Sequence, residues 1–297
     1  MTTTAATSLE NRLKQVISSI RNLPTPPIVF EQIQKVLNDP ATSVGDVADI
    51  LSEDPAMSVK VLKLTNSAFY GLSREIESVK QAVMIIGLEA VKNLVLSASV
   101  LSMFKAKNEF KEYHENFWRH SLATALSARV IARDFQDGKV FNPDPAFSSG
   151  LIHDIGKMVF CCFLQKEHKE IMDYMEKNPD TNEAAAEIAV LGFNHAQLGR
   201  QLAVTWKLPE RMADTVGYHH NPNLENASDN FAYLINLANY VAHFNFHSEE
   251  AELERCKLDS AVLEFFKIEK SYIENLKGKL IEEYTKAETF MKMAGVG

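Results

Sequence analysis

Residues 146–164 read Ala-Phe-Ser-Ser-Gly-Leu-Ile-His-Asp-Ile-Gly-Lys-Met-Val-Phe-Cys-Cys-Phe-Leu, which places the pair His153-Asp154 inside a run of apolar residues. The length and apolar content of this run predict a buried helix. Adjacent residues on a helix point about 100° apart. The two members of the pair can therefore contribute to one site only where neighbouring helices converge around them.

Apolar runs with helical spacing continue on both sides of this stretch. The chain has 12 glycines in 297 residues, which suits helices joined by short loops better than a sheet with many tight turns. No series of alternating strands is evident. We therefore predict an all-α fold, with helices at about 9–20, 28–37, 81–86, 88–104, 113–135, 146–164, 183–191, 196–206, 209–220 and 230–246, and a helical tail over 258–293.

Two further short helices are predicted from their capping residues. Ser43 and Asp46 have the spacing of a capping box. Asp54 is a good N-cap, and Pro55 then takes the first helical position. The pair has the outline of a helix-turn-helix. The net charge of -8 argues against a phosphate-binding surface, so a DNA-binding regulator is the least favoured function and nucleic acid is not an expected partner.

Composition indicates a folded cytoplasmic protein. Hydrophobic residues make up 46% of the chain and charged residues 24%. Three cysteines, two of them adjacent, cannot form a disulfide framework and favour a reducing compartment. The first ten residues lack the order of a signal peptide. The most apolar uncharged run, between Lys92 and Lys105, is shorter than the roughly 20 residues of a membrane span, so no membrane partner is expected.

Several of the nine histidines fall at informative places. His120 lies within a predicted helix, His195 opens one, and His219-His220 close another. Imidazole and carboxylate ligands suit divalent transition metals such as Fe, Mn, Ni or Zn. Two such metals would lower the pKa of a bridging water and stabilise a phosphoester displacement. The sequence therefore predicts a divalent transition-metal site with one ion or two.

The motifs also carry a family resemblance. The string from Phe147 to Lys157 resembles the signature of the HD phosphohydrolase superfamily, and the later histidines are similar in arrangement to its HD-GYP branch of cyclic-di-GMP phosphodiesterases. The N-terminal half resembles HDOD proteins specifically, through Asp54-Pro55-Ala56, Val61-Leu-Lys-Leu-Thr-Asn-Ser-Ala68 and Ala82-Val-Met-Ile-Ile-Gly87. The resemblance implies a helical bundle of the HD-domain/PDEase-like type with an N-terminal helical subdomain. We expect a lead-in at 1–22, the N-terminal subdomain at 23–108, an HD-like metal-site subdomain at 109–250 and a tail at 251–297 that packs on the bundle.

The resemblance implies six metal ligands, and Asp154 with Lys157 as candidate catalytic residues. The metal ligands are His120, His153, Asp154, His195, His219 and His220. Two acids of the HD-GYP enzymes are missing, because Asn116 (with Glu115 one step off) and Asn239 stand where carboxylates are expected. The Gly-Tyr-Pro segment is also absent. The loss of two negative charges favours metal binding over catalysis.

Each candidate residue has a structural alternative. A histidine in a helical bundle can simply hydrogen-bond a carbonyl or carboxylate, and Lys157 can be a solvated helix lysine instead of a phosphate-binding one. Cys161-Cys162 is expected to fill the core, and both tryptophans to anchor packing. The histidines that match no motif are expected at the surface or in local hydrogen bonds; they are His114, His168, His243 and His247.

The leading prediction is a bacterial HDOD signal-transduction output protein whose pocket holds metal and a nucleotide or phosphate ligand. The alternative is a metal-dependent phosphohydrolase acting on a nucleotide or cyclic dinucleotide. In that case water activated at Asp154 would attack phosphorus, with Lys157 holding phosphate oxygens. Signalling proteins and a second copy of the chain are the expected partners.

Overall fold

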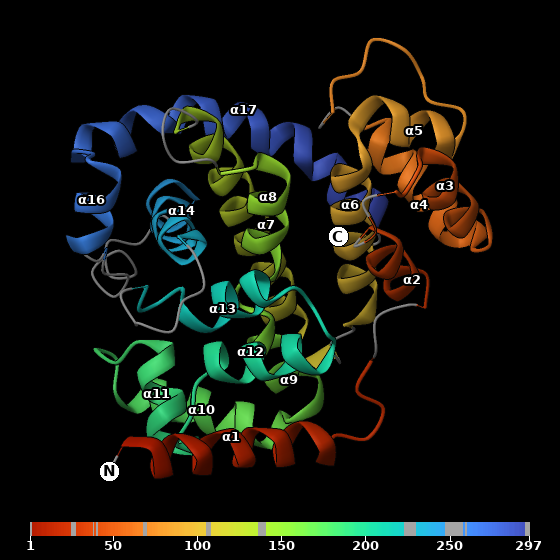
Figure 1. Cartoon of the computed structure of the whole chain (residues 1–297). Helices are drawn as coiled ribbons and strands as arrows, with labels where there is room; N and C mark the ends of the chain where they lie inside the picture. Colours follow the sequence, from red (N-terminus) through yellow and green to blue (C-terminus); the bar gives the residue numbers. More distant parts are fainter. Residues whose placement is uncertain are drawn as a thin grey trace.

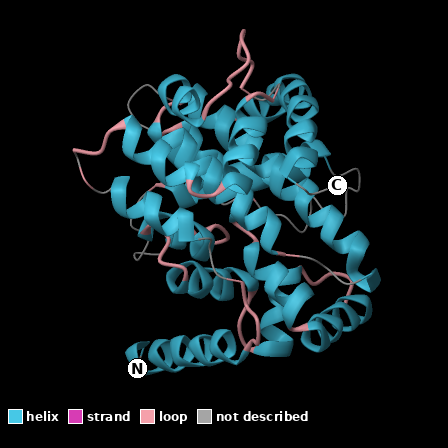
Figure 2. Ribbon diagram, turned by 90° about the vertical axis from the view of Figure 1, so that its right-hand side faces the viewer, coloured by secondary structure: helices cyan, strands magenta, loops and turns pink. Residues whose placement is uncertain are grey.

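The protein is all-helical, as the sequence predicts. The structure, a computed structural model, describes residues 2–24, 28–37, 39, 41–67, 70–104, 108–135, 141–222, 230–246, 258 and 260–294. All regular secondary structure in these ranges is helix, and none is strand (Figures 1 and 2). Within them, no single helix is both long and apolar enough to cross a membrane.

The N-terminal half consists of α2 (Ile28–Leu37), α3 (Val44–Ser52), α4 (Pro55–Thr65), α5 (Val79–Ile86) and the longer α6 (Leu88–Met103). Helices α2, α4 and α5 pack on α6, and α3 packs on these three shorter helices. Both predicted caps form: Ser43 and Asp46 make a capping box, and the Asp54 side chain accepts from the Met57 N–H at 3.0 Å. After α4, Asn66 holds the connecting loop, because its amide bonds both the N–H and the C=O of Ile76, at 2.7 and 2.8 Å.

The second half surrounds α7 (Lys111–Asp134), which packs against α8 (Pro143–Ile152) and α14 (Phe231–Phe246). Below them α12 (His195–Thr205) packs between α9 (Ile155–Phe163) and α13 (Glu210–Tyr218). The predicted single helix over 146–164 is therefore wrong in one respect. It is interrupted at His153-Asp154, and α9 begins after Asp154, whose side chain makes no hydrogen bond to the start of that helix.

Three segments differ from the expected boundaries. The N-terminal helix α1 spans Thr2–Ser19, is longer than predicted, and packs on α12. A helix that the sequence reading missed, α10 (Gln165–Lys177), follows α9 and leads to α11 (Glu183–Leu191). The tail forms two helices, α16 (Ser260–Phe266) and α17 (Lys270–Ala294). A short 3-10 turn at Asn108–Phe110 directly precedes α7. Residues 136–140, between the helices predicted at 113–135 and 146–164, lie outside the described residues.

The two halves are joined by a shared cluster of buried side chains, which runs from Phe30 and Leu64 in the N-terminal half to Leu151 and Val216 in the second. A second cluster, which includes Leu234 and Leu276, lies among α7, α14 and the tail helices. The tail helix α17 packs on α7 and also on α4 and α6, so it spans both halves (Figure 1). The division of the chain into a lead-in, two subdomains and a tail at 251–297 stays a prediction.

Candidate metal centre

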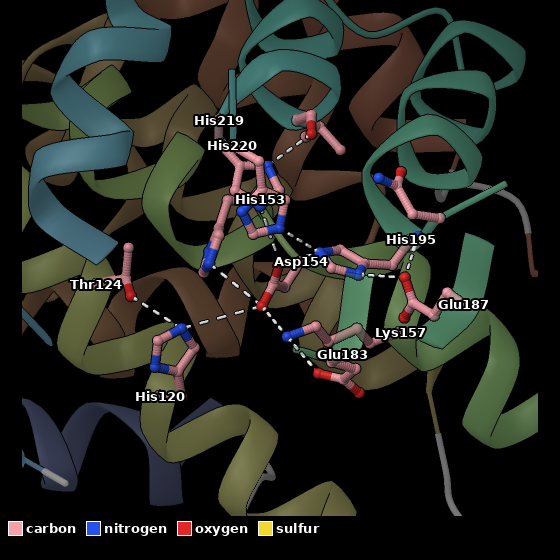
Figure 3. A network of polar contacts seen from close by, with 12 residues as sticks. His120, Thr124, His153, Asp154, Lys157, Glu183, Glu187, His195, His219 and His220 are labelled. Atoms are coloured by element: carbon pink, nitrogen blue, oxygen red, sulfur yellow. Dashed lines mark hydrogen bonds and ion pairs between the residues drawn. The ribbon is translucent and has the colours of Figure 1, made fainter. Parts of the chain in front are cut away.

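The six predicted ligands come from four places in the chain and meet at one point (Figure 3). His120 lies on α7, and His153-Asp154 form the break between α8 and α9. His195 is the first residue of α12, and His219-His220 directly follow α13. Most of these side chains therefore lie at or next to the ends of helices, where residues from separate helices can converge.

Asp154 is the centre of the cluster, and its two oxygens face different histidines. Oδ1 lies 3.1 Å from His195 Nε2 and 3.2 Å from His219 Nε2. Oδ2 lies 3.4 Å from His153 Nε2 and 3.9 Å from His120 Nε2. The Asp154 side chain is only 2% exposed. A carboxylate placed this way can link two neighbouring cation positions.

The donor atoms form two groups that share Asp154, each with all its atoms within 4.8 Å of one another. One group is Asp154 with three histidines, and the other is Asp154 with two; the full sets are Asp154, His195, His219 and His220, and His120, His153 and Asp154. Nitrogen and oxygen ligands in this number suit a divalent transition metal, and the pairing suits a binuclear site.

Hydrogen bonds at the outer ring nitrogens orient three of the histidines. His153 Nδ1 donates to the Gly150 carbonyl and His219 Nδ1 to the Val216 carbonyl, both at 2.8 Å. His195 Nδ1 lies 2.7 Å from a Glu187 carboxylate oxygen. A carbonyl can only accept, so Nδ1 carries the proton and Nε2 presents its lone pair to the centre. This arrangement is how proteins orient metal-binding imidazoles.

The polar atoms at the centre fit a bound cation. His153 Nε2, His219 Nε2 and Asp154 Oδ1 are buried and have no hydrogen-bond partner. Buried polar atoms are almost always paired. Metal ions held by the two groups would satisfy all three atoms, because His153 belongs to one group, His219 to the other and Asp154 to both.

Burial and neighbouring charges shift the ionisation of the cluster. Burial lowers the pKa of His219 to about 4, and it also holds the pKa of His120 and of His220 well below the usual value. Burial alone would raise the pKa of Asp154, but His153 and Lys157 outweigh it and hold that pKa well below the usual value. Three neutral imidazoles around an ionised carboxylate are the protonation states that metal binding needs.

Lys157 is buried in an ion-pair network and is not a solvated helix lysine. Its ammonium lies 2.7 Å from Asp154 Oδ2 and 2.8 Å from Glu183 Oε2, and its side chain is 17% exposed. Tyr113 donates to the other Glu183 oxygen at 2.7 Å. Burial opposes the charge on Lys157, but the two carboxylates outweigh it and raise its pKa above the usual value.

Sequence reasoning missed Glu183 and Glu187. Glu187 is 1% exposed and bonds both the backbone N–H and the ring of His195, each at 2.7 Å. Burial lowers the pKa of His195, but Glu187 and Asp154 outweigh it and raise that pKa to about 9. The signal was the string Glu-Ala-Ala-Ala-Glu at 183–187, in which two acids four residues apart share a helix face lined by alanines.

The residues at the two missing acid positions lie in different environments. Asn116 is exposed on α7, and Glu115 beside it is paired with Lys111 at 3.7 Å. Asn239 is 5% exposed on α14, and its amide oxygen has no hydrogen-bond partner. Asn239 is thus the one of the two positions that the fold keeps inside the protein.

Some of the remaining histidines and cysteines lie where the sequence predicts, and others do not. His114 makes the expected local bonds, lying 3.0 Å from Trp118 Nε1 and 3.2 Å from the Phe104 carbonyl. The expectation of a surface place is wrong for His168, which is 2% exposed between the rings of Phe110 and Tyr113. For His243 the expectation did not include a place beside the metal centre, yet its ring centroid lies 4.4 Å from that of His120. Cys161 is in the core as predicted, and His247 and Cys256 lie outside the described residues.

Fold and site together define an all-helical protein with a buried histidine cluster centred on Asp154. The HDOD domain model matches residues 23–222, and the chain belongs to this family. An uncharacterised protein of Treponema pallidum is 24% identical over 269 residues, or 90% of this chain and 49% of that protein. The chain thus spans about half the length of that curated relative. The partners and substrates of this chain are therefore treated as proposals below.

Solved structures show the same fold. A candidate signal transduction protein of Marinobacter aquaeolei has a TM-score of 0.77 at 20% identity, covering 98% of this chain and 66% of that one. A candidate metal-dependent phosphohydrolase of Shewanella amazonensis has a TM-score of 0.63 at 21% identity, covering 97% and 99%. At these identities the likeness establishes the fold alone.

Proposed function

We propose that this protein is an HDOD output module of bacterial signal transduction that binds a divalent transition metal at the Asp154 cluster. The ligands are His120, His153, Asp154, His195, His219 and His220, and the metal is Fe, Mn, Ni or Zn. The observation that supports it most is the convergence of unpaired, buried Nε2 atoms of His153 and His219 on Asp154. The cytoplasm suits this role because its reducing conditions keep Cys161 and Cys162 as free thiols.

The second candidate is a metal-dependent phosphohydrolase acting on a nucleotide or a cyclic dinucleotide. A bound metal pair would supply an activated water and a clamp for phosphate oxygens. Lys157 sits beside Asp154 as that role needs, but Asp154 and Glu183 already engage its ammonium. With amides at Asn116 and Asn239, the pocket carries fewer negative charges to balance two dications. Metal binding without turnover is therefore the favoured function.

Mn²⁺ binding followed by electron paramagnetic resonance of the free ion tests the metal site. We expect saturable binding to the metal-free protein that His153→Gln weakens at least tenfold, because one nitrogen ligand is lost. The matched control His114→Gln removes an imidazole outside the cluster and should bind as the wild type does. Equal binding by all three proteins would exclude the Asp154 cluster as the site.

Hydrolysis assays separate the two candidates. Metal-loaded protein is offered a generic aryl phosphodiester and a panel of nucleotides and cyclic dinucleotides. The output-module proposal expects binding of metal with no turnover above the metal-free protein. Turnover that disappears in Asp154→Ala would instead establish the phosphohydrolase.

A further inference from the structure

The ammonium of Lys157 occupies a place beside Asp154 that another cation could take. It lies 2.7 Å from Asp154 Oδ2 and 2.8 Å from Glu183 Oε2, so it bridges two carboxylates (Figure 3). The same Asp154 oxygen also faces His153 and His120, the two histidines of the smaller ligand group. The ammonium and a metal ion in that group would therefore share one carboxylate oxygen.

We propose that Lys157 takes the place of a second metal ion, so that the two ligand groups bind metal with very different affinity. The inference rests on the proposed metal site and specifies how many ions it holds tightly. We name the two groups by the Asp154 oxygen that they use. The Oδ1 group, the tight place, is Asp154 with His195, His219 and His220, and the Oδ2 group, the weak place, is Asp154 with His120 and His153.

The two oxygens of Asp154 differ in their partners. Within the described part of the chain, Oδ1 is buried and has no hydrogen-bond partner, whereas Oδ2 contacts the ammonium. The histidines also lie closer to Oδ1, from which His195 Nε2 and His219 Nε2 are 3.1 and 3.2 Å away. His153 Nε2 and His120 Nε2 lie 3.4 and 3.9 Å from Oδ2. The Oδ1 group is thus more compact, and its oxygen is open to a cation.

Repulsion between charges makes the Oδ2 group the weak place. A metal ion bound to Oδ2 at about 2.1 Å would lie within about 5 Å of the ammonium, which is 2.7 Å from the same oxygen. A dication and an ammonium repel each other at this range. Solvent screens this repulsion poorly, because the Lys157 side chain is only 17% exposed and that of Asp154 only 2%.

Glu183 and Tyr113 hold the ammonium in this position. Glu183 is the first residue of α11, and its second oxygen accepts from the Tyr113 hydroxyl of α7 at 2.7 Å. Lys157 therefore has a second counter-charge that a third helix fixes in turn. An entering metal ion could push the ammonium aside only by breaking the ion pairs to both carboxylates.

One tightly held ion per chain follows from this arrangement. A clamp made of two metal ions is then not assembled at ordinary metal concentrations. This agrees with a protein that binds metal without turning over a phosphoester.

Stepwise Mn²⁺ titration of the metal-free full-length protein tests the inference, with the free ion followed by electron paramagnetic resonance. The wild type is compared with Lys157→Met and Lys157→Gln, which both remove the buried charge. Lys166→Met, which removes a lysine 84% exposed on α10, is the matched control.

We expect the wild type and Lys166→Met to bind a second equivalent about 100-fold more weakly than the first, because the ammonium repels it. Both Lys157 variants should bind the second equivalent about tenfold more tightly than the wild type, since two carboxylates then face the place without a cation between them. A substitution that merely damaged the site would weaken binding. Tighter binding therefore identifies the removed charge as the cause.

Two histidine variants assign the equivalents to the groups. His219→Gln should weaken the first equivalent, because His219 belongs to the Oδ1 group. The loss of Mn²⁺ affinity expected for His153→Gln should fall on the second equivalent, because His153 belongs to the Oδ2 group.

Two equivalents of similar affinity in the wild type would overturn the inference, and this measurement needs no variant to fold. A second equivalent that neither Lys157 variant tightens would overturn it as well. Either result leaves the metal proposal standing, because metal is still bound at the Asp154 cluster. Absence of any Mn²⁺ binding would instead overturn the metal proposal, and this inference with it.

Discussion

Three of the imidazoles at the centre are oriented by the group that their outer ring nitrogen contacts. Backbone carbonyls fix His153 and His219, whereas a carboxylate, Glu187, fixes His195. The six candidate ligands could be named from the sequence because local motifs mark them. Glu187 could not, because its role depends on how α11 packs near the start of α12, eight residues later. Lys157 was found, but its contact with Glu183 comes from the same tertiary packing.

Glu187→Gln should weaken metal binding about 10–100-fold, because groups that orient a ligating histidine contribute this much to affinity. The fold should be retained, since glutamine can still accept from the His195 backbone N–H. Mn²⁺ titration measures the effect, and Glu176→Gln, an exposed position on α10, is the control. Unchanged affinity in Glu187→Gln would show that Glu187 does not position His195.

At the scale of elements, the contact between α9 and α12 places the ligands. A side chain at Gly156 would meet the His195 carbonyl oxygen at 2.0 Å, so only glycine permits this approach. The helices themselves were predictable from apolar spacing and caps. The interruption at His153-Asp154 was not, because the apolar pattern continues through it. The α10 helix was missed although its buried residues His168 and Ile171 are three apart, as on one helix face.

Gly156→Ala should lower the free energy of unfolding by about 3 kcal/mol, because the added methyl meets backbone that cannot move aside. It should also reduce metal affinity by displacing His195. Gly278→Ala is the matched control, since nothing lies within 4 Å of its Cβ position on α17. That change should raise stability by about 0.5–1 kcal/mol. Urea denaturation measures both, and equal stability of the two variants would contradict the close packing.

His168 on α10 should make stability depend on pH. Burial lowers its pKa, so the folded protein holds it neutral while the unfolded chain gains a proton near pH 6.5. Its contribution is present above pH 6.5 and is lost as the pH falls. His168→Phe should therefore lose less unfolding free energy between pH 7.5 and 5.5 than the wild type does, measured in urea. The metal-site histidines titrate in the wild type and in His168→Phe alike, so the difference between the two proteins reports His168. An identical pH dependence would contradict the buried neutral state.

At the scale of the whole molecule, the two ends of the chain hold the halves together. Trp206 Nε1 donates to the Pro24 carbonyl at 3.0 Å, which fixes the segment after α1 to the end of α12. The sequence identified Trp206 as a packing anchor but could not name its partner, 182 residues away. The same limit applies to α17, whose contacts with α4, α6 and α7 depend on the complete fold.

The shared core predicts one cooperative unfolding transition. Leu64→Ala, at a position with 0% exposure on α4, should cost about 2–5 kcal/mol. Tryptophan fluorescence reports the second half through Trp118 and Trp206, and far-ultraviolet circular dichroism reports all helices. Leu64→Ala should lower the midpoint of the unfolding transition equally by both probes. Val59→Ala, at a position 50% exposed on the same helix, should leave the midpoint unchanged by both. A shift in circular dichroism alone would indicate two independent units.

The metal content of untagged protein, measured by elemental analysis beside Asp154→Asn and the control Asp173→Asn, tests the central claim most directly. Asp154 contributes to both groups of candidate ligands, whereas Asp173 is exposed on α10. We predict at least one equivalent of Fe, Mn, Ni or Zn per chain in the wild type and in Asp173→Asn, and its loss in Asp154→Asn. Absence of metal from the wild type, even after anaerobic incubation with Fe²⁺ and Mn²⁺, would contradict the account.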